Sequence, residues 1–263
     1  MFTQSKMNGS LLTQSWVQAT RLLTRLRRDT AVLMGSLMLP ICLLLVYKVV
    51  LGEQVHRVTG VDSLYGVVPI CALLSALFGA LGGSVGIHTD RESRLLSRMW
   101  VLPVHRASAL IGFFIAEALR ALFGTILITS LGVFLGLRFA HGWLAVVVYL
   151  LIPSIMVIGY SALVLAIAIR SNGRGIMNWL VGATITLAFV NPGTTPIKQF
   201  PDWLQPIVRA QPMSPPIEAM WALSYGGPLL WPLVVTLIWA TVLFAVFTPI
   251  AMRGYQIAAE SNG

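Results

Sequence analysis

The sequence predicts an all-α integral membrane protein, and two observations carry that prediction. Hydrophobic residues make up 57% of the 263 residues, charged residues only 10%, and the mean hydropathy is +0.82. A soluble domain of this size could not bury so much apolar surface in one core. In addition, six apolar stretches are long enough to cross a hydrocarbon layer, which needs about 20 residues. Because unpaired backbone groups are prohibitive in lipid, we expect six helices within one domain, residues 1–263.

The expected spans follow one another with no room for a soluble domain between them. The fifth is the shortest, and the sixth carries a proline near each end. In order they are Ala31–Leu51, Leu64–Ile87, Ala107–Leu137, Trp143–Ile169, Ile176–Val190 and Pro228–Met252.

The stretch before the first span is patterned as an amphipathic helix over about residues 11–28. One face is apolar: Leu12, Trp16, Ala19, Leu23 and Leu26. The opposite face is polar and basic: Gln14, Gln18, Arg21, Arg25 and Arg28. Such a helix lies in the membrane interface, with its arginines toward lipid phosphates or a partner. A plain topology anchor and an additional docking role both remain open.

The connection between the second and third spans concentrates charge. Arg91, Arg94 and Arg98 share a helical face over residues 90–100, and Pro103 ends that helix. The pattern fits either a short basic helix or a solvated loop that obeys the positive-inside rule.

Lysine and arginine predict the orientation of the chain. One side holds five at the N-terminus, four in the 88–106 loop, Arg170, Arg174 and Arg253, which outnumber the five on the other side. The bias places both termini in the cytoplasm. Most of the net charge of +9 then faces anionic lipid headgroups on the cytoplasmic side, and no soluble basic face indicates nucleic-acid binding.

Two charged residues interrupt the third span. Glu117 and Arg120 have the i, i+3 spacing that brings side chains within reach on a helix. Either they serve a translocation path or subunit interface, or they are a self-neutralised structural pair. In the second span, glycines at 79, 82, 83 and 86 favour close helix packing or a dimer interface over a hinge or a substrate groove.

Residues 191–228 carry eight of the fourteen prolines, so they cannot form a straight span. We expect a re-entrant segment of extracellular half-helices. Its apolar side chains form either a gate for a lipid-like substrate or a cap over the bundle. The candidate gate residues are Phe200, Trp203, Met213 and Trp221.

No pattern indicates catalysis, a bound cofactor or a metal. The histidines lack metal-ligand spacing, and no serine stands in a G-x-S-x-G elbow. None of the three lysines lies in a G-x-x-x-x-G-K-[ST] phosphate-binding loop. An integral-membrane enzyme acting on lipid, a passive channel and an anchor subunit are the alternatives to a transporter.

Two motifs carry a resemblance that decides between these classes. The first comprises Arg91–Glu92, Leu95–Arg98 and Trp100–Ser108, and the second comprises Phe200–Pro206 and Gln211–Ser214. Together with the six spans they resemble the type-2 ABC transporter permeases, most of all the daunorubicin-resistance branch with its mycobacterial third-component lipid and drug exporters. One departure is Ser93–Arg94, where the wider superfamily commonly has a glycine.

The resemblance implies a permease without its own ATPase. ATP and Mg would be bound by two copies of a separate nucleotide-binding subunit, and a second permease, more often different than identical, would complete the exporter. The substrate would be a complex lipid or lipophilic antibiotic leaving the cytoplasmic membrane. The helices at 11–28 and 90–100 would contact the nucleotide-binding subunit through Arg21, Arg25, Arg28, Arg91, Glu92, Arg94 and Arg98.

Overall fold

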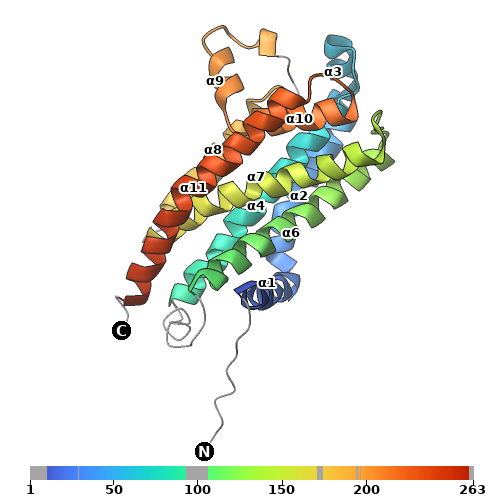
Figure 1. Cartoon of the computed structure of the whole chain (residues 1–263). Helices are drawn as coiled ribbons and strands as arrows, with labels where there is room; N and C mark the ends of the chain where they lie inside the picture. The colour runs from blue at the N-terminus through green and yellow to red at the C-terminus, as the bar shows by residue number, and fades with distance from the viewer. Residues whose placement is uncertain are drawn as a thin grey trace, which may run out of the picture.

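The computed structural model describes residues 11–28, 30–92, 106–170, 174–193, 195 and 197–260. Every secondary-structure element in these ranges is a helix, and the long helices lie side by side as an elongated bundle (Figure 1). The all-helical prediction is therefore confirmed for the described part of the chain.

The long helices match the expected spans closely. They are α2 (Thr30–Val46), α4 (Leu64–Glu92), α6 (Arg106–Phe134), α7 (Gly142–Arg170), α8 (Arg174–Phe189) and α11 (Leu230–Glu260). The shorter elements are α1 (Leu11–Arg28), the π-helix η1 (Tyr47–Leu51), α3 (Gly52–Thr59), the 3-10 helix η2 (Ile197–Gln199), α9 (Gln205–Ala210) and α10 (Ser214–Ser224).

Four of these helices are long and apolar enough to cross a membrane. Their apolar stretches are Leu64–Gly83, Leu110–Phe134, Gly142–Arg170 and Leu230–Gly254. The first and fifth expected spans form shorter apolar helices, Met34–Val50 and Gly175–Phe189. The membrane class is thus supported by four helices in the described ranges, and crossing by all six stays a prediction.

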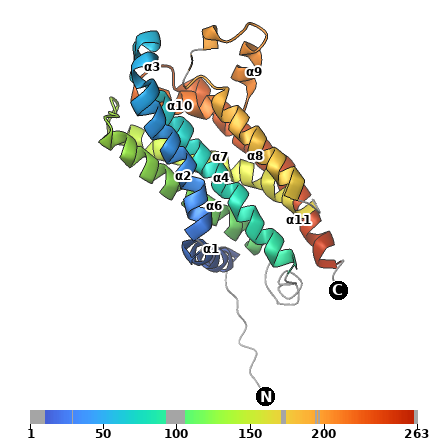
Figure 2. The same cartoon turned by 180° about the vertical axis from the view of Figure 1, so that it is seen from behind.

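Helix α7 is the centre of the bundle, because it packs against α4, α6, α10 and α11 (Figure 2). Tyr149, Ile152 and Val157 of α7 are fully buried or nearly so. A Cβ atom on Gly159 would lie 2.5 Å from the carbonyl oxygen of Ala240, so α11 rests on the α7 backbone itself. Small residues permit this close approach, and dispersion forces across the contact hold the helices together.

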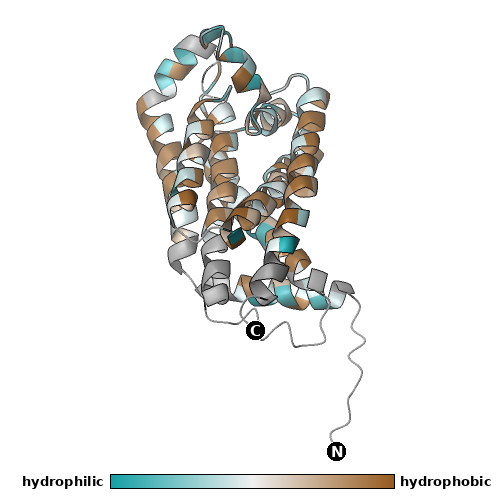
Figure 3. Ribbon diagram, turned by 90° about the vertical axis from the view of Figure 1, so that its left-hand side faces the viewer, coloured by the Kyte–Doolittle hydropathy of each residue, from teal (hydrophilic) through white to brown (hydrophobic). Residues whose placement is uncertain are grey.

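The two ends of the bundle differ. Helix α1 and the C-terminal end of α11 lie at one end, whereas α3, α9 and α10 lie at the other (Figure 1). Helix α1 runs across the bundle rather than along it, as an interfacial helix would. Hydrophilic residues gather mainly at the two ends, and apolar residues follow the long helices between them (Figure 3).

Candidate functional site

Glu117 and Arg120 form an ion pair inside the bundle, with exposed fractions of only 2% and 6%. The Arg120 guanidinium donates two hydrogen bonds to Oε2 of Glu117, from Nε at 3.0 Å and from Nη2 at 2.6 Å. It also reaches α4, donating to the carbonyl of Ala76 at 2.9 Å and to that of Ser75 at 3.5 Å. The pair therefore neutralises itself and attaches α6 to the backbone of α4.

Two glycines of α4 make room for this pair. A Cβ on Gly79 would lie 1.2 Å from Nη1 of Arg120, and a Cβ on Gly83 would lie 2.4 Å from Oε1 of Glu117. The glycines at these two positions let α6 lie close to α4, with the ion pair between the two helices. That they accommodate charged side chains rather than another backbone was not foreseen.

The position of the pair matters because α4 and α6 flank the basic connection between the second and third spans. Helix α4 continues to Glu92 and α6 begins at Arg106, so the predicted 90–100 helix overlaps the end of α4. Arg94 and Arg98 lie outside the described residues, and the side chains of Arg91 and Glu92 are not described. The ion pair links the two helices that enter and leave this connection.

Helix α1 packs on α6 near the same end of the bundle. Ser15 and Ala19 are fully buried, and a Cβ on Gly112 would lie 2.6 Å from Cβ of Gln18 and 2.8 Å from the carbonyl oxygen of Ser15. The face that contacts protein thus contains Ser15, which the predicted apolar face omitted. Trp16 is 58% exposed and Arg21 is also exposed. The small side chains of Ser15 and Ala19 lie against α6, and the bulky Trp16 indole points away from this contact, toward the expected membrane interface.

Of the other predicted contact residues in α1, Arg25 and Arg28 belong to the helix, but their side chains are not described. The structure places α1, the start of α6 and the end of α4 at one end of the bundle (Figure 1), and Arg21 is the one predicted contact residue whose side chain it describes.

The predicted gate residues differ in their burial. Met213 is 2% exposed and belongs to the core, whereas Trp203 is 70% exposed. Phe200 is half-buried and its carbonyl accepts a hydrogen bond from Gln205. Trp221 lines a pocket beside α10.

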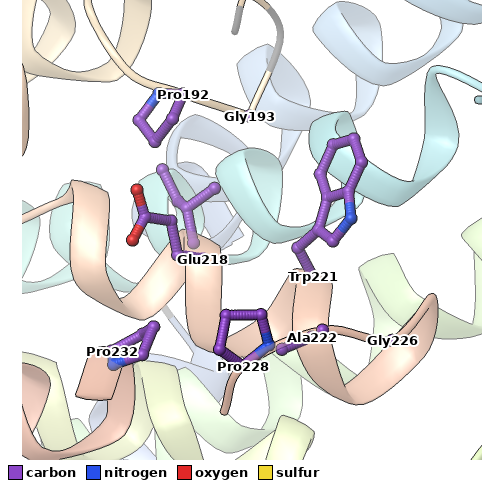
Figure 4. A pocket seen from close by; sticks show the side chains of 10 residues that line it. Pro192, Gly193, Glu218, Trp221, Ala222, Gly226, Pro228 and Pro232 are labelled. Carbon is purple, nitrogen blue, oxygen red and sulfur yellow. The ribbon is translucent and has the colours of Figure 1, made fainter. Parts of the chain in front are cut away.

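A pocket of about 330 Å³ lies beside α10, and we call it the α10 pocket (Figure 4). Its walls come from α10, the loop after α8 and the start of α11. Glu218 supplies the carboxylate among its lining residues, and Trp221 supplies an indole. Burial raises the pKa of Glu218, an effect that the positive charge of Arg209 partly offsets.

Buried amide groups hold the loop over this pocket. The backbone N–H of Gly193 donates to Oδ1 of Asn191 at 2.8 Å, and the side-chain amide of Gln211 donates to the carbonyl of Val190 and, at 2.8 Å, to Oγ of Ser214. Gln211 and Ser214 belong to the second sequence motif. Glu218 was not singled out from the sequence, because a lone carboxylate in a proline-rich segment has no pattern that would identify it.

Within the described ranges, no three His, Cys, Asp or Glu side chains gather closely enough to hold a metal ion.

Comparison with known proteins identifies the family. Residues 13–225 match the model of the ABC-2 type transporter family. The chain is 35% identical over 247 residues to the probable doxorubicin resistance ABC transporter permease protein DrrC of Mycobacterium tuberculosis, covering 94% of this chain and 89% of that protein. It is 25% identical over 230 residues to the daunorubicin resistance ABC transporter permease protein DrrB1 of Streptomyces coeruleorubidus, covering 85% and 79%. Together with the apolar helical bundle, these matches show that the protein belongs to the ABC-2 type transporter family and is a membrane-embedded permease subunit, a class in which a separate subunit hydrolyses ATP.

Proposed function

We propose that this chain is the permease subunit of an exporter that moves a hydrophobic or amphipathic compound, a complex lipid or a lipophilic antibiotic, out of the cytoplasmic membrane. The observation that carries the proposal is the 35% identity, over 94% of this chain, to a probable doxorubicin resistance permease. The apolar bundle suits a substrate that partitions into lipid.

The contacts around the 93–105 connection support a mechanism for driving export. Helix α1 packs on α6, and α6 is attached to α4 through the Glu117–Arg120 pair. A nucleotide-binding subunit that displaces the connection would move α4 and α6 together, because the pair resists their separation. Packed helices transmit such rigid-body shifts, since their interfaces do not deform continuously.

The complete exporter would contain two nucleotide-binding subunits, which bind ATP and Mg, and a second permease, in our proposal a different chain. Both termini would lie in the cytoplasm. In support, α1 and the C-terminal end of α11 lie at the same end of the bundle (Figure 1). Membrane lipids would surround the exposed apolar faces of α2 and α11.

The test of coupling is a double reversal, Arg94→Glu with Arg98→Glu. Each exposed pair contributes only about 0–1 kcal/mol, but two reversals add repulsion against an acidic partner surface. We expect the pull-down of the cognate nucleotide-binding subunit and the export of doxorubicin from the same cells to fall together. Full attachment and full export would refute the coupling role.

A matched control reverses two exposed basic residues at the other end of the bundle, Arg138→Glu with Lys198→Glu. This variant should keep both attachment and export, because it changes net charge equally but away from the connection. ATP hydrolysis should be absent from the purified chain alone and should appear, sensitive to vanadate, when the cognate subunit is added.

A further inference from the structure

The α10 pocket holds a carboxylate that the described part of the protein leaves without a partner. Glu218 receives no hydrogen bond and forms no ion pair with the described residues. Arg209 acts on it electrostatically from beyond ion-pair distance. Partial burial of a carboxylate without an adjacent countercharge is unfavourable, and this burial raises the pKa of Glu218 although the charge of Arg209 lowers it in part. A cation entering the pocket would remove that cost.

The remaining lining is apolar and aromatic. Trp221 follows Glu218 by three residues on α10, so the two side chains share one face of the helix (Figure 4). The prolines at 192, 228 and 232 complete the walls. An indole face attracts organic cations through its quadrupole, most strongly where water is excluded.

Specific contacts fix the walls of the pocket. A Cβ on Gly66 would lie 1.5 Å from the carbonyl oxygen of Gly193 and 3.1 Å from the Trp221 ring. The loop and the indole therefore both rest on the backbone of α4. The Asn191 and Gln211 amides hold the loop in place. Such fixed walls lower the ordering cost of binding a ligand.

We propose that the α10 pocket binds an ammonium group carried on an apolar body, with the cation against Glu218 and the apolar part against Trp221. The proposal deepens the proposed function by naming a substrate class, and it rests on that function. A volume of about 330 Å³ is at the lower end for ligand pockets, so it would take an amine with one attached ring rather than the whole of a large molecule.

Binding is tested on the full chain in phosphatidylglycerol nanodiscs, which contain no lipid ammonium. The probes are 4-phenylbutylamine and its uncharged analogue 4-phenyl-1-butanol, titrated by saturation-transfer NMR. We expect the amine to bind more tightly than the alcohol. Glu218→Gln should weaken amine binding about tenfold or more, as expected for a charged hydrogen bond, and should change alcohol binding less than about twofold.

Two further variants keep the result interpretable. Glu218→Asp retains the charge and should keep most of the preference for the amine. Glu53→Gln is the matched control, since Glu53 lies in α3 at the same end of the bundle and is exposed, and it should bind both probes as the wild type does. Equal amine affinity in wild type and in correctly folded Glu218→Gln would overturn the proposal.

The outcome is separable from that of the proposed function. Amine binding that needs Glu218, without ATP-driven export of doxorubicin from cells that contain the cognate subunits, would support the pocket and contradict the proposed exporter. Export that is unaffected by Glu218→Gln, together with equal amine binding by the wild type and this variant, would support the exporter and contradict the pocket. Repeating the titration in phosphatidylethanolamine shows whether a lipid headgroup competes, which would identify lipid as one source of the ammonium group.

Discussion

Replacing Glu117 by glutamine should destabilise the bundle strongly, because it strands the charge of Arg120. Two of the four hydrogen bonds that Arg120 donates go to Glu117, and the others go to α4 carbonyls. Breaking a buried pair by removing one charge costs about 3–5 kcal/mol. Arg120→Gln should cost less, since a stranded carboxylate can take up a proton whereas a guanidinium cannot lose one in proteins.

The double variant Glu117→Gln with Arg120→Gln removes both charges and should be more stable than either single variant. The coupling energy should then be at least about 2 kcal/mol. Unfolding in mixed detergent micelles, followed by tryptophan fluorescence, measures the four free energies of the cycle.

The matched control is the exposed pair between Glu53 and Arg57 in α3, at 2.5 Å and with side chains 77% and 73% exposed. Its cycle should give a coupling energy of only about 0.3–0.5 kcal/mol. If the buried cycle is additive, or no larger than this control, Glu117 and Arg120 do not hold α4 and α6 together and the coupling mechanism loses its basis.

Three further predictions concern helix contacts and the carboxylates of Asp62 and Glu218. Gly159→Ala should destabilise the protein by about 1–3 kcal/mol in the same unfolding assay, because its Cβ would lie 2.5 Å from the Ala240 carbonyl oxygen. Gly182→Ala is the control: its Cβ would have no atom within 4 Å, so the change should be neutral or slightly stabilising. Gly112→Val should displace α1 from α6 and reduce pull-down of the nucleotide-binding subunit; unchanged attachment would show that α1 packing does not matter for docking. Asp62 and Glu218 should give opposite pH dependences of thermal stability, checked with Asp62→Asn and Glu218→Gln between pH 3 and 8. Burial raises the pKa of Asp62, but the Leu64 N–H and Lys48 bring it below 3.8, so its stabilisation is present above that pH and is lost as pH falls through the lowered value. Burial raises the pKa of Glu218, so its stabilising contribution is present below pH 4.5 and is lost as the pH rises through the raised value. The thermal stability of Glu218→Gln should therefore rise relative to that of the wild type toward neutral pH. The same sign of pH dependence for both residues would contradict these assignments.

Composition and local pattern determined much of this protein from the sequence. Apolar runs predicted where helices lie, because an apolar chain in lipid must satisfy its backbone hydrogen bonds within each segment. The proline-rich stretch predicted the break that the structure shows as η2, α9 and α10. The motif within residues 91–108 and the motif within residues 200–214 indicated the family, which the similarity to known permeases confirms.

Contacts between helices were decided by the tertiary structure alone. The apolar stretch of α4 is 89% buried within the protein and that of α11 only 11%, although both are apolar throughout. In lipid a side chain toward a neighbouring helix and one toward the bilayer are equally apolar, so the sequence carries no alternation that separates them. Three features depend on residues far apart in the chain or on walls that other helices supply. They are the glycines of α4 that accommodate the Glu117–Arg120 pair, the face of α1 that contains Ser15 and Ala19, and the pocket that Glu218 and Trp221 line together. Only their packing in three dimensions brings these groups together.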